Sequence, residues 1–197
     1  MAAPRPRAPA LTFPAELLLA ARGPGDGIAA AIFDVDGVLT DGSIWLGEGG
    51  EIVKAFSTLD GQGMKLLQIA GIVPIVVTGR DSPAVRRRMA DLGVVHAAYG
   101  IDDKMAAAAA LVAALGLDWQ RIAAIGDDWP DLPILQRAAF ACAPPNAHVE
   151  VRAVAHHVTA AAGGEGAARE FCDLLLVAAG RYAALLRSPQ FALDASR

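Results

Sequence analysis

Two aspartates, two residues apart, follow a short apolar run near the start of the chain. In Ile32-Phe33-Asp34-Val35-Asp36-Gly37-Val38-Leu39-Thr40, the apolar residues predict a buried strand, and Asp34 and Asp36 leave its end. Residues i and i+2 of an extended chain point to the same side, so the two carboxylates are expected close together. Like charges that close repel unless a cation neutralises them or one carboxylate is protonated. The pair therefore predicts a divalent-metal site with one nucleophile and one proton donor.

Simpler structures explain this run less well. An Asp-Gly turn accounts for Asp36 and Gly37 but not for Asp34 at the strand end. A calcium-binding loop needs Gly at its sixth position and Glu at its twelfth, whereas counting from Asp34 puts the glycine fourth and Trp45 twelfth. Helix capping does not fit, because the residues that follow predict a hairpin rather than a helix.

Two further motifs could bind an anion. Thr78 ends another apolar run and offers a hydroxyl and a backbone N–H, and Gly79 lets the backbone approach a ligand closely. Lys104 stands where a strand turns into a helix, and its ammonium can act as a point charge for phosphate. Taken singly, Thr78 could instead cap the helix at Ser82, and Lys104 could be a solvated helix residue.

The fourth motif, Ile125-Gly126-Asp127-Asp128-Trp129-Pro130-Asp131, again places acidic residues after a short apolar strand. Asp127 and Asp131 lie four residues apart, so the second can support the first across one helical turn. Mg²⁺ prefers carboxylate oxygens and keeps several waters. Asp34 and Asp127 are therefore expected to share one Mg²⁺ if their strands are neighbours.

Apolar runs alternate with amphipathic segments along most of the chain. This alternation favours an α/β fold, a Rossmann-like parallel sheet with helices on both faces. Because the carboxyl ends of parallel strands share one edge, the fold would gather the four motifs into one site that suits phosphoryl transfer. The expected strands cover residues 28–33, 73–77, 94–99, 122–125 and 139–142, and the expected helices cover 61–70, 82–92, 104–115, 132–138 and about 167–186.

A β-hairpin insertion is expected at about residues 42–56, after the first strand, because two short strands flank Gly47-Glu48-Gly49-Gly50. It would lie over the carboxyl edge of the sheet. The expected organisation is a partly disordered N-terminal arm of residues 1–27 with a short helix near 15–21, one domain of residues 28–187, and a C-terminal tail of residues 188–197.

Composition narrows the class of protein further. The 197 residues carry a formal net charge of −4, which gives no general attraction to nucleic acid or to an anionic membrane. No stretch of 18 apolar residues exists, so no membrane span is expected. Cys142 and Cys172 fit no disulfide framework or metal-ligand spacing and are expected as buried thiols. These features predict a cytoplasmic protein without nucleic-acid or membrane partners.

In their order and spacing, the four motifs resemble those of the haloacid-dehalogenase superfamily of phosphatases, over residues 28 to about 181. The resemblance implies that Asp34 is the nucleophile and Asp36 the general acid and base. It implies that Thr78 and Lys104 hold the phosphoryl oxygens.

The resemblance also implies a metal site. Mg²⁺ would be bound by Asp34, the main-chain carbonyl of Asp36 and Asp127. Asp128 and Asp131 would support these ligands.

Other segments resemble a small, capless branch of the superfamily that hydrolyses 3-deoxy-D-manno-octulosonate 8-phosphate, an eight-carbon sugar-acid phosphate of lipopolysaccharide synthesis. This branch implies a homotetramer in which the hairpin and the loop at Gly163–Gly166 complete the site. The segments are 36–42, the hairpin, Lys54-Ala55-Phe56, Asp60-Gly61-Gln62-Gly63, 126–128, 163–170 and 172–176.

One position departs from the branch and leaves the exact sugar acid open. Leu59 stands where many members carry Arg before Asp-Gly-x-Gly, an arginine suited to a substrate carboxylate. Arg80 could bind that carboxylate bidentately, and the related enzymes of nine-carbon sugar-acid 9-phosphates tend to have an acidic residue there. The expected substrate-binding set is Thr78, Gly79, Arg80, Arg88 and Lys104, although Arg88 lies in a basic run typical of a solvated helix face. Trp45 could contact either substrate or another subunit.

Two alternatives belong to other classes of protein. A signalling receiver domain also uses Asp, Thr and Lys, but its acceptor would have to be Asp102 or Asp103, and Lys104 follows too closely. A catalytically inactive interaction protein could keep the same fold, although the whole catalytic set is intact here.

Overall fold

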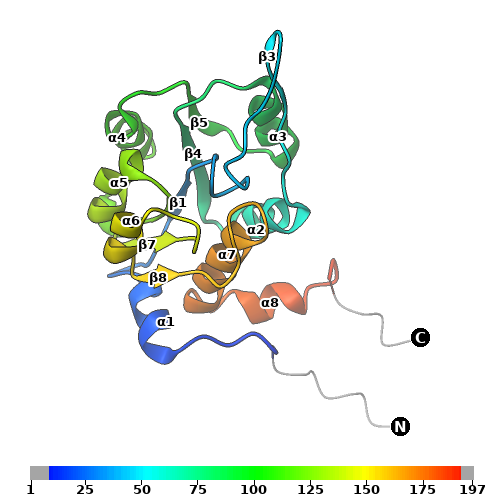
Figure 1. Ribbon diagram of the computed structural model, residues 1–197. Helices are drawn as coiled ribbons and strands as arrows, with labels where there is room; N and C mark the ends of the chain where they lie inside the picture. Colours follow the sequence, from blue (N-terminus) through cyan, green and yellow to red (C-terminus); the bar gives the residue numbers. More distant parts are fainter. Residues whose placement is uncertain (1–8, 192–197) are drawn as a thin grey trace, which may run out of the picture.

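The computed structural model describes residues 9–191 (Figure 1). Residues 1–8 of the expected arm and 192–197 of the expected tail lie outside the described residues. Six parallel strands form one sheet in the order β5-β4-β1-β6-β7-β8. They are β1 (Ala30–Phe33), β4 (Val73–Thr78), β5 (His96–Tyr99), β6 (Ile122–Ile125), β7 (Phe140–Ala143) and β8 (His157–Val158).

The order of these strands identifies the type of sheet. Leaving the hairpin out, they follow the chain order 3-2-1-4-5-6, which is the Rossmann arrangement. The predicted fold class is therefore confirmed. A receiver domain has the order 2-1-3-4-5, so the topology excludes that alternative. The order reverses beside β1, which is paired with β4 on one side and β6 on the other, and such a reversal is where open α/β sheets bind ligands.

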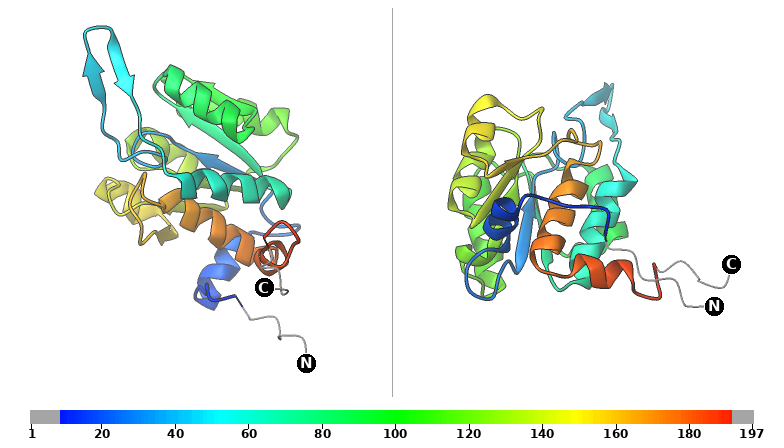
Figure 2. Two further views of the ribbon diagram at one scale, coloured as in Figure 1. Left: turned by 90° about the vertical axis from the view of Figure 1, so that its right-hand side faces the viewer. Right: turned by 90° about the horizontal axis from the view of Figure 1, so that it is seen from below.

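Helices cover both faces of the sheet, as Figure 2 shows. They are α1 (Ala15–Arg22), α2 (Thr58–Ile69), α3 (Pro83–Leu92), α4 (Lys104–Ala114), α5 (Leu132–Arg137), α6 (Val149–Val154), α7 (Ala167–Ala178) and α8 (Tyr182–Leu186), with 3₁₀ turns η1 (Trp119–Arg121) and η2 (Trp129–Asp131). Alternate strand residues face opposite sides, so β1 sends Ala31 and Phe33 toward α2, α3 and α7, and Ala30 and Ile32 toward α4, α5 and α6. Burial on both faces explains why the strands are continuous apolar runs.

The last predicted helix, at about 167–186, is wrong as a single element. It is divided into α7 and α8 by Gly180, whose φ is 69°. The Arg181 N–H donates to the Leu176 carbonyl and the Gly180 N–H to the Val177 carbonyl, a pattern that terminates a helix at a left-handed glycine. α8 thereby turns to pack against the same core as α7.

The predicted hairpin is present, formed by β2 (Trp45–Gly47) and β3 (Gly50–Val53) in antiparallel pairing. It is a separate two-stranded sheet that extends away from the main body (Figure 2). Its two strands occupy only the middle of the predicted region of about residues 42–56. Lys54 to Phe56 instead lead directly down to α2.

A glycine loop after β8 fits tightly onto the loop after β1. The Gly164 N–H donates to the Val38 carbonyl at 2.9 Å. Asn146 joins the two loops, because its Nδ2 donates to the Gly37 carbonyl at 3.0 Å and its Oδ1 accepts from the Gly163 N–H at 2.8 Å. A Cβ on Gly163 would collide with the Gly37 carbonyl oxygen and lie 2.9 Å from the Thr40 oxygen. The loop at 163–166 therefore supports the Asp34–Thr40 loop within the same chain.

This contact gives a test of stability. Gly163→Ala should lower the free energy of unfolding by about 1–3 kcal/mol, because the new methyl group meets backbone that has little room to move. In thermal unfolding Tm should fall by roughly 2–12 °C. The matched control is Gly49→Ala in the hairpin turn, where a Cβ meets nothing within 4 Å and Tm should change little. A Gly163→Ala protein as stable as wild type would mean that the two loops are not held together.

Candidate active site

The four predicted motifs meet at the carboxyl edge of four adjacent strands. Asp34 follows β1, Thr78 ends β4, Lys104 begins α4 just after β5, and Asp127 follows β6. The Asp34 N–H donates to the Ile125 carbonyl at 3.1 Å, which continues the pairing of β1 with β6 up to the site. The fold therefore brings together residues from 34 to 131 of the sequence, as the spacing of the motifs predicts.

Lys104 lies between two carboxylates. Its Nζ is 2.6 Å from Asp34 Oδ1 and 2.7 Å from Asp131 Oδ1, and all three side chains are nearly inaccessible to solvent. An ammonium has three N–H donors, so one remains for a further acceptor such as a phosphoryl oxygen. Lys104 thus fixes the nucleophile candidate and can still contact an anion.

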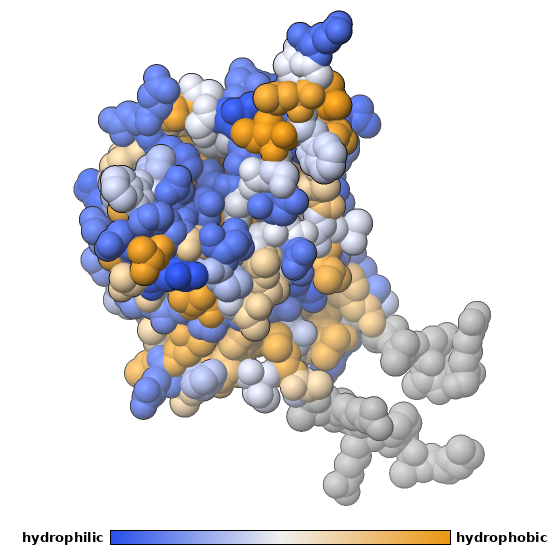
Figure 3. Space-filling model, in the orientation of Figure 1, coloured by the Kyte–Doolittle hydropathy of each residue, from blue (hydrophilic) through white to orange (hydrophobic). Residues whose placement is uncertain are grey.

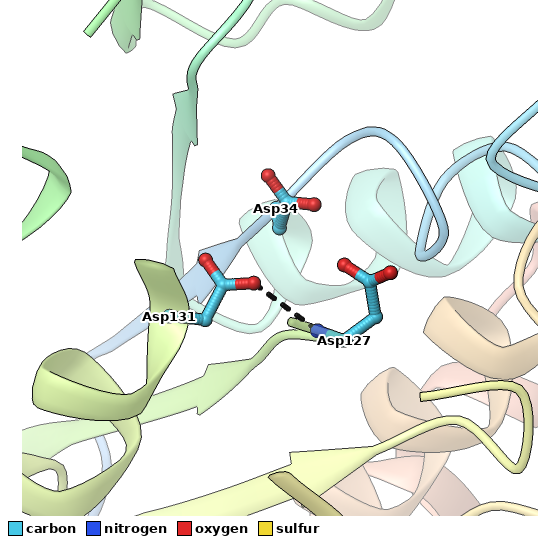
Figure 4. A group of neighbouring side chains, drawn as sticks. All are labelled: Asp34, Asp127 and Asp131. Carbon is cyan, nitrogen blue, oxygen red and sulfur yellow. Dashed lines mark hydrogen bonds between the residues drawn. The ribbon is translucent and has the colours of Figure 1, made fainter. Parts of the chain in front are cut away.

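Asp34, Asp127 and Asp131 form a compact cluster of carboxylates (Figure 4). One oxygen from each lies within 4.8 Å of the others, close enough to share a metal ion. Asp131 uses both oxygens within the protein, because Oδ1 accepts from Lys104 and Oδ2 accepts from the Asp127 N–H at 3.1 Å. Within residues 9–191, no N–H donates a hydrogen bond to Asp34 Oδ2 or to the Asp127 carboxylate, and these two carboxyl groups are close enough to hydrogen-bond each other when one is protonated. Asp34 and Asp127 therefore offer ligand oxygens, and Asp131 orients the site.

The charges of the cluster are not balanced. Burial and the neighbouring Asp131 raise the pKa of Asp34 well above its usual value, although Lys104 opposes them. The same two causes raise the pKa of Asp127 to about 6. Burial alone would lower the pKa of Lys104, but Asp34 and Asp131 outweigh it and the pKa lies above its usual value. Three acids against one ammonium leave excess negative charge, and hard oxygen donors of this kind fit Mg²⁺.

Asp36 is not part of this cluster, because its side chain contacts a different lysine. Its Oδ1 forms an ion pair with Nζ of Lys54, the residue that follows the hairpin. The Asp36 side chain is 20% exposed, so it can reach a ligand at the open edge. The next residue, Gly37, lies so close to Asp127 that a Cβ would collide with the Asp127 carboxylate. The backbone after Asp36 therefore borders the metal-site candidate.

The other expected substrate ligands occupy varied positions. Thr78 is buried, and its Oγ1 accepts from the Arg80 N–H at 3.3 Å. Gly79 has open space beside it, because a Cβ added there would approach only the Ile101 carbonyl oxygen, at 3.6 Å. Arg80 is partly exposed and lies 3.6 Å from Glu51 of the hairpin. These three could contact an anionic ligand at the mouth of the site.

Arg88 and Asp128 are engaged elsewhere in the described structure. Arg88 donates to the Ser57 carbonyl at 3.1 Å and lies over the Phe56 ring, so it supports the start of α2. Asp128 caps η2 by accepting from the Trp129 N–H. Leu59, at the start of α2, is 55% exposed.

Sequence reasoning gave no role to Lys54 and did not single out Glu51 or Asn146. Lys54 is wholly buried beside Asp36, and Glu51 forms an ion pair with it. A single lysine or glutamate in a hairpin is usually a solvated surface residue. Their role could be found only from the tertiary contact, because more than 15 residues separate Lys54 from Asp36 in the chain.

Both cysteines are buried free thiols, as predicted. Burial raises the pKa of each thiol far above its usual value, so neither is a reactive thiolate. Across the described part of the chain, no helix combines the length and the apolar character that crossing a bilayer requires.

Comparison with known proteins identifies the family of the chain. A family model described as haloacid dehalogenase-like hydrolase matches residues 98–171. The chain is 40% identical over 156 residues to the 3-deoxy-D-manno-octulosonate 8-phosphate phosphatase KdsC of Salmonella typhi, covering 79% of this chain and 83% of that protein.

Solved structures give the same result. A 3-deoxy-D-manno-octulosonate 8-phosphate phosphatase from Moraxella catarrhalis, in complex with magnesium, phosphate and KDO, is 38% identical with a TM-score of 0.81 over 87% of this chain and 96% of that one. The cobalt-bound phosphatase from Haemophilus influenzae is 38% identical with a TM-score of 0.80, covering 84% and 96%. With its four motifs on a Rossmann-type sheet and this identity over most of its length, the chain belongs to the haloacid-dehalogenase-like hydrolases and is a phosphoric monoester hydrolase.

Proposed function

We propose that the chain hydrolyses 3-deoxy-D-manno-octulosonate 8-phosphate to the free sugar acid and phosphate, with Mg²⁺ as cofactor, in lipopolysaccharide synthesis. The observation that carries the proposal is the buried Asp34 carboxylate, held by Lys104 beside Asp127 at the reversal of strand order. The named relatives act on this substrate, and one of them was crystallised with magnesium and phosphate.

In the first step an Asp34 oxygen attacks phosphorus, and the bond from phosphorus to the sugar oxygen breaks. Asp36 donates a proton to that leaving oxygen, so the sugar acid departs as an alcohol and an aspartyl-phosphate remains on Asp34. In the second step a water attacks the same phosphorus while Asp36 accepts its proton. Phosphate leaves and Asp34 is regenerated, so one residue serves as acid and then as base.

The remaining residues would bind the metal ion and the phosphoryl oxygens in both steps. Bound Mg²⁺ would supply positive charge between the carboxylates and the phosphoryl oxygens, with Asp34, the Asp36 carbonyl and Asp127 as its protein ligands. Lys104, with one N–H to spare, and Thr78, at the end of β4, would bind phosphoryl oxygens. Asp128 and Asp131 would support the metal ligands.

The choice of sugar acid depends on the residue that binds the substrate carboxylate. Arg80 is the substrate-carboxylate ligand that we propose, since it is partly exposed at the mouth of the site and Leu59 cannot form a salt bridge. The alternative substrate is a nine-carbon sugar-acid 9-phosphate. The cytoplasmic location also stays a prediction.

We further propose that the chain forms a homotetramer through the hairpin. Five apolar side chains there are 43–67% exposed: Ile44, Trp45, Leu46, Ile52 and Val53. They form hydrophobic surface near the top of Figure 3, and contiguous apolar surface of this kind marks interaction sites. A second copy of the chain is the proposed partner, which assigns Trp45 to subunit contact.

Activity is the first test. Wild-type protein with Mg²⁺ should release phosphate from 3-deoxy-D-manno-octulosonate 8-phosphate faster than from a nine-carbon acid 9-phosphate or from neutral hexose phosphates. Asp34→Asn should lower kcat by at least about 10³-fold, because it removes the nucleophile. Preference for the nine-carbon acid would keep the mechanism and change the substrate. Wild type without activity on any of these substrates would refute the proposed sugar-phosphate substrate.

Metal binding should depend on pH through Asp127. Its pKa of about 6 lies above the unperturbed 3.8, so the metal-free folded protein loses stability as pH rises between these values. Mg²⁺ binds the ionised form and should therefore raise Tm more at pH 7.5 than at pH 5. Asp127→Asn should abolish this Mg²⁺-dependent shift, while Asp102→Asn, an exposed acid outside the cluster, should keep it. A shift that survives in Asp127→Asn would place the metal elsewhere.

Assembly can be measured by light scattering after gel filtration. Wild type should have about four times the 20.3 kDa mass of one chain. Ile52→Asp should give smaller species, because burying a charge in an apolar interface is costly. Val95→Asp, which changes an 81% exposed residue before β5, serves as the control and should leave the mass unchanged. A monomeric wild type would refute the hairpin interface.

A further inference from the structure

We propose that Lys54 is a positioning residue, which fixes the Asp36 carboxyl group for proton transfer to the leaving oxygen and is itself held by Glu51 of the hairpin. The inference rests on the proposed function, because it assumes that Asp36 is the acid of the first step. It adds a residue outside the four motifs and connects the hairpin to the chemistry.

The burial of Lys54 shows that it is not a surface lysine. Its side chain is 0% exposed, whereas lysines are almost never fully buried without a partner. Its ammonium pairs with Asp36 Oδ1 and lies 3.1 Å from Glu51 Oε2, in ion-pair range. The Glu51 oxygen is buried and accepts no hydrogen bond of good geometry, so its contact with Lys54 is chiefly one of charge. The lysine is therefore held by two carboxylates: Glu51 of the hairpin and Asp36 of the loop after β1.

Glu51 is anchored in turn to the body of the protein. Its Oε1 accepts from the hydroxyl of Ser82, the residue before α3, and Arg80 lies 3.6 Å from Oε2. Desolvation would raise the pKa of Glu51, but the hydrogen bond from Ser82 and the positive charge of Lys54 outweigh it and lower the pKa, so Glu51 stays ionised. A chain of contacts thus runs from α3 through Glu51 and Lys54 to Asp36.

This arrangement fixes one oxygen of Asp36 and leaves the other available. Within residues 9–191, no hydrogen bond from the protein reaches Asp36 Oδ2. A carboxyl group held at one oxygen keeps a single rotamer, and its second oxygen can then face the leaving group. Misplacement of a catalytic group by about 1 Å can cost roughly 10²-fold in rate. Loss of Lys54 should therefore impair proton transfer while leaving Asp34, Asp127 and Lys104 in place.

The leaving group of the substrate distinguishes this role from a merely structural one. A sugar oxygen needs a proton to depart, whereas p-nitrophenolate departs as a stable anion. For both substrates kcat/KM reports the steps up to the transfer of phosphate to Asp34. A defect in the placement of Asp36 should reduce kcat/KM for the sugar phosphate far more than for p-nitrophenyl phosphate. Damage to the fold or to the metal site should reduce both alike.

The experiment compares wild type, Lys54→Met, Lys54→Arg and the control Lys65→Met, an exposed lysine on α2, with Mg²⁺ present. Lys54→Met should lose about 10²-fold in kcat/KM on the sugar phosphate, within the range of general acid catalysis, and less than about 10-fold on p-nitrophenyl phosphate. Lys54→Arg should restore part of the loss, and Lys65→Met should match wild type. The Mg²⁺-dependent rise in Tm should persist in every variant.

Equal losses on the two substrates, or full activity of Lys54→Met, would overturn the proposal. If Lys54→Met fails to fold, Lys54→Arg and Glu51→Gln still test the proposal. Glu51→Gln weakens the contact that holds Lys54. It should therefore also lower kcat/KM more for the sugar phosphate than for p-nitrophenyl phosphate, although by a smaller factor. If wild type has no phosphatase activity, the proposed function itself fails. Activity in wild type with no selective defect in these variants refutes the role of Lys54 alone.

Discussion

The ammonium of Lys104, shared between Asp34 and Asp131, is the interaction on which the site depends. Three carboxylates within 4.8 Å of one another at a buried strand edge would repel strongly without it. One lysine does not neutralise all three, so the site keeps an affinity for a cation. Burial and, after it, repulsion from Asp131 raise the pKa of both Asp34 and Asp127.

The topology of the sheet provides the place where such a cluster can exist. β1 lies between β4 and β6, so a loop from each of three strands opens at the same edge. The Asp34–Thr40 loop is then held from outside by Asn146 and the glycines at 163 and 164. This support keeps the loop compact although it carries two acidic side chains. The same strand order and motifs accompany the sequence identity that shows membership of the haloacid-dehalogenase-like hydrolases.

The hairpin has a double character. Its apolar side chains are exposed to the surroundings, whereas Glu51 of β3 and Lys54 just after β3 form the ion pairs that lead to Asp36. In the proposed tetramer, the subunit contact and the support of Asp36 would therefore lie on the same short segment of the chain.

The sequence by itself determined the strands and helices that carry the site, because continuous apolar runs and helical periodicity are local properties. It also indicated Asp34, Thr78, Lys104 and Asp127, since each stands at the end of such a run. Only the tertiary structure decided that Lys104 binds Asp131 as well as Asp34, and that Lys54 is buried beside Asp36. It also showed Arg88 bound to the Ser57 carbonyl and the last helix broken at Gly180. Such contacts join residues that are far apart in the chain, so they cannot be predicted from residue types and their local spacing.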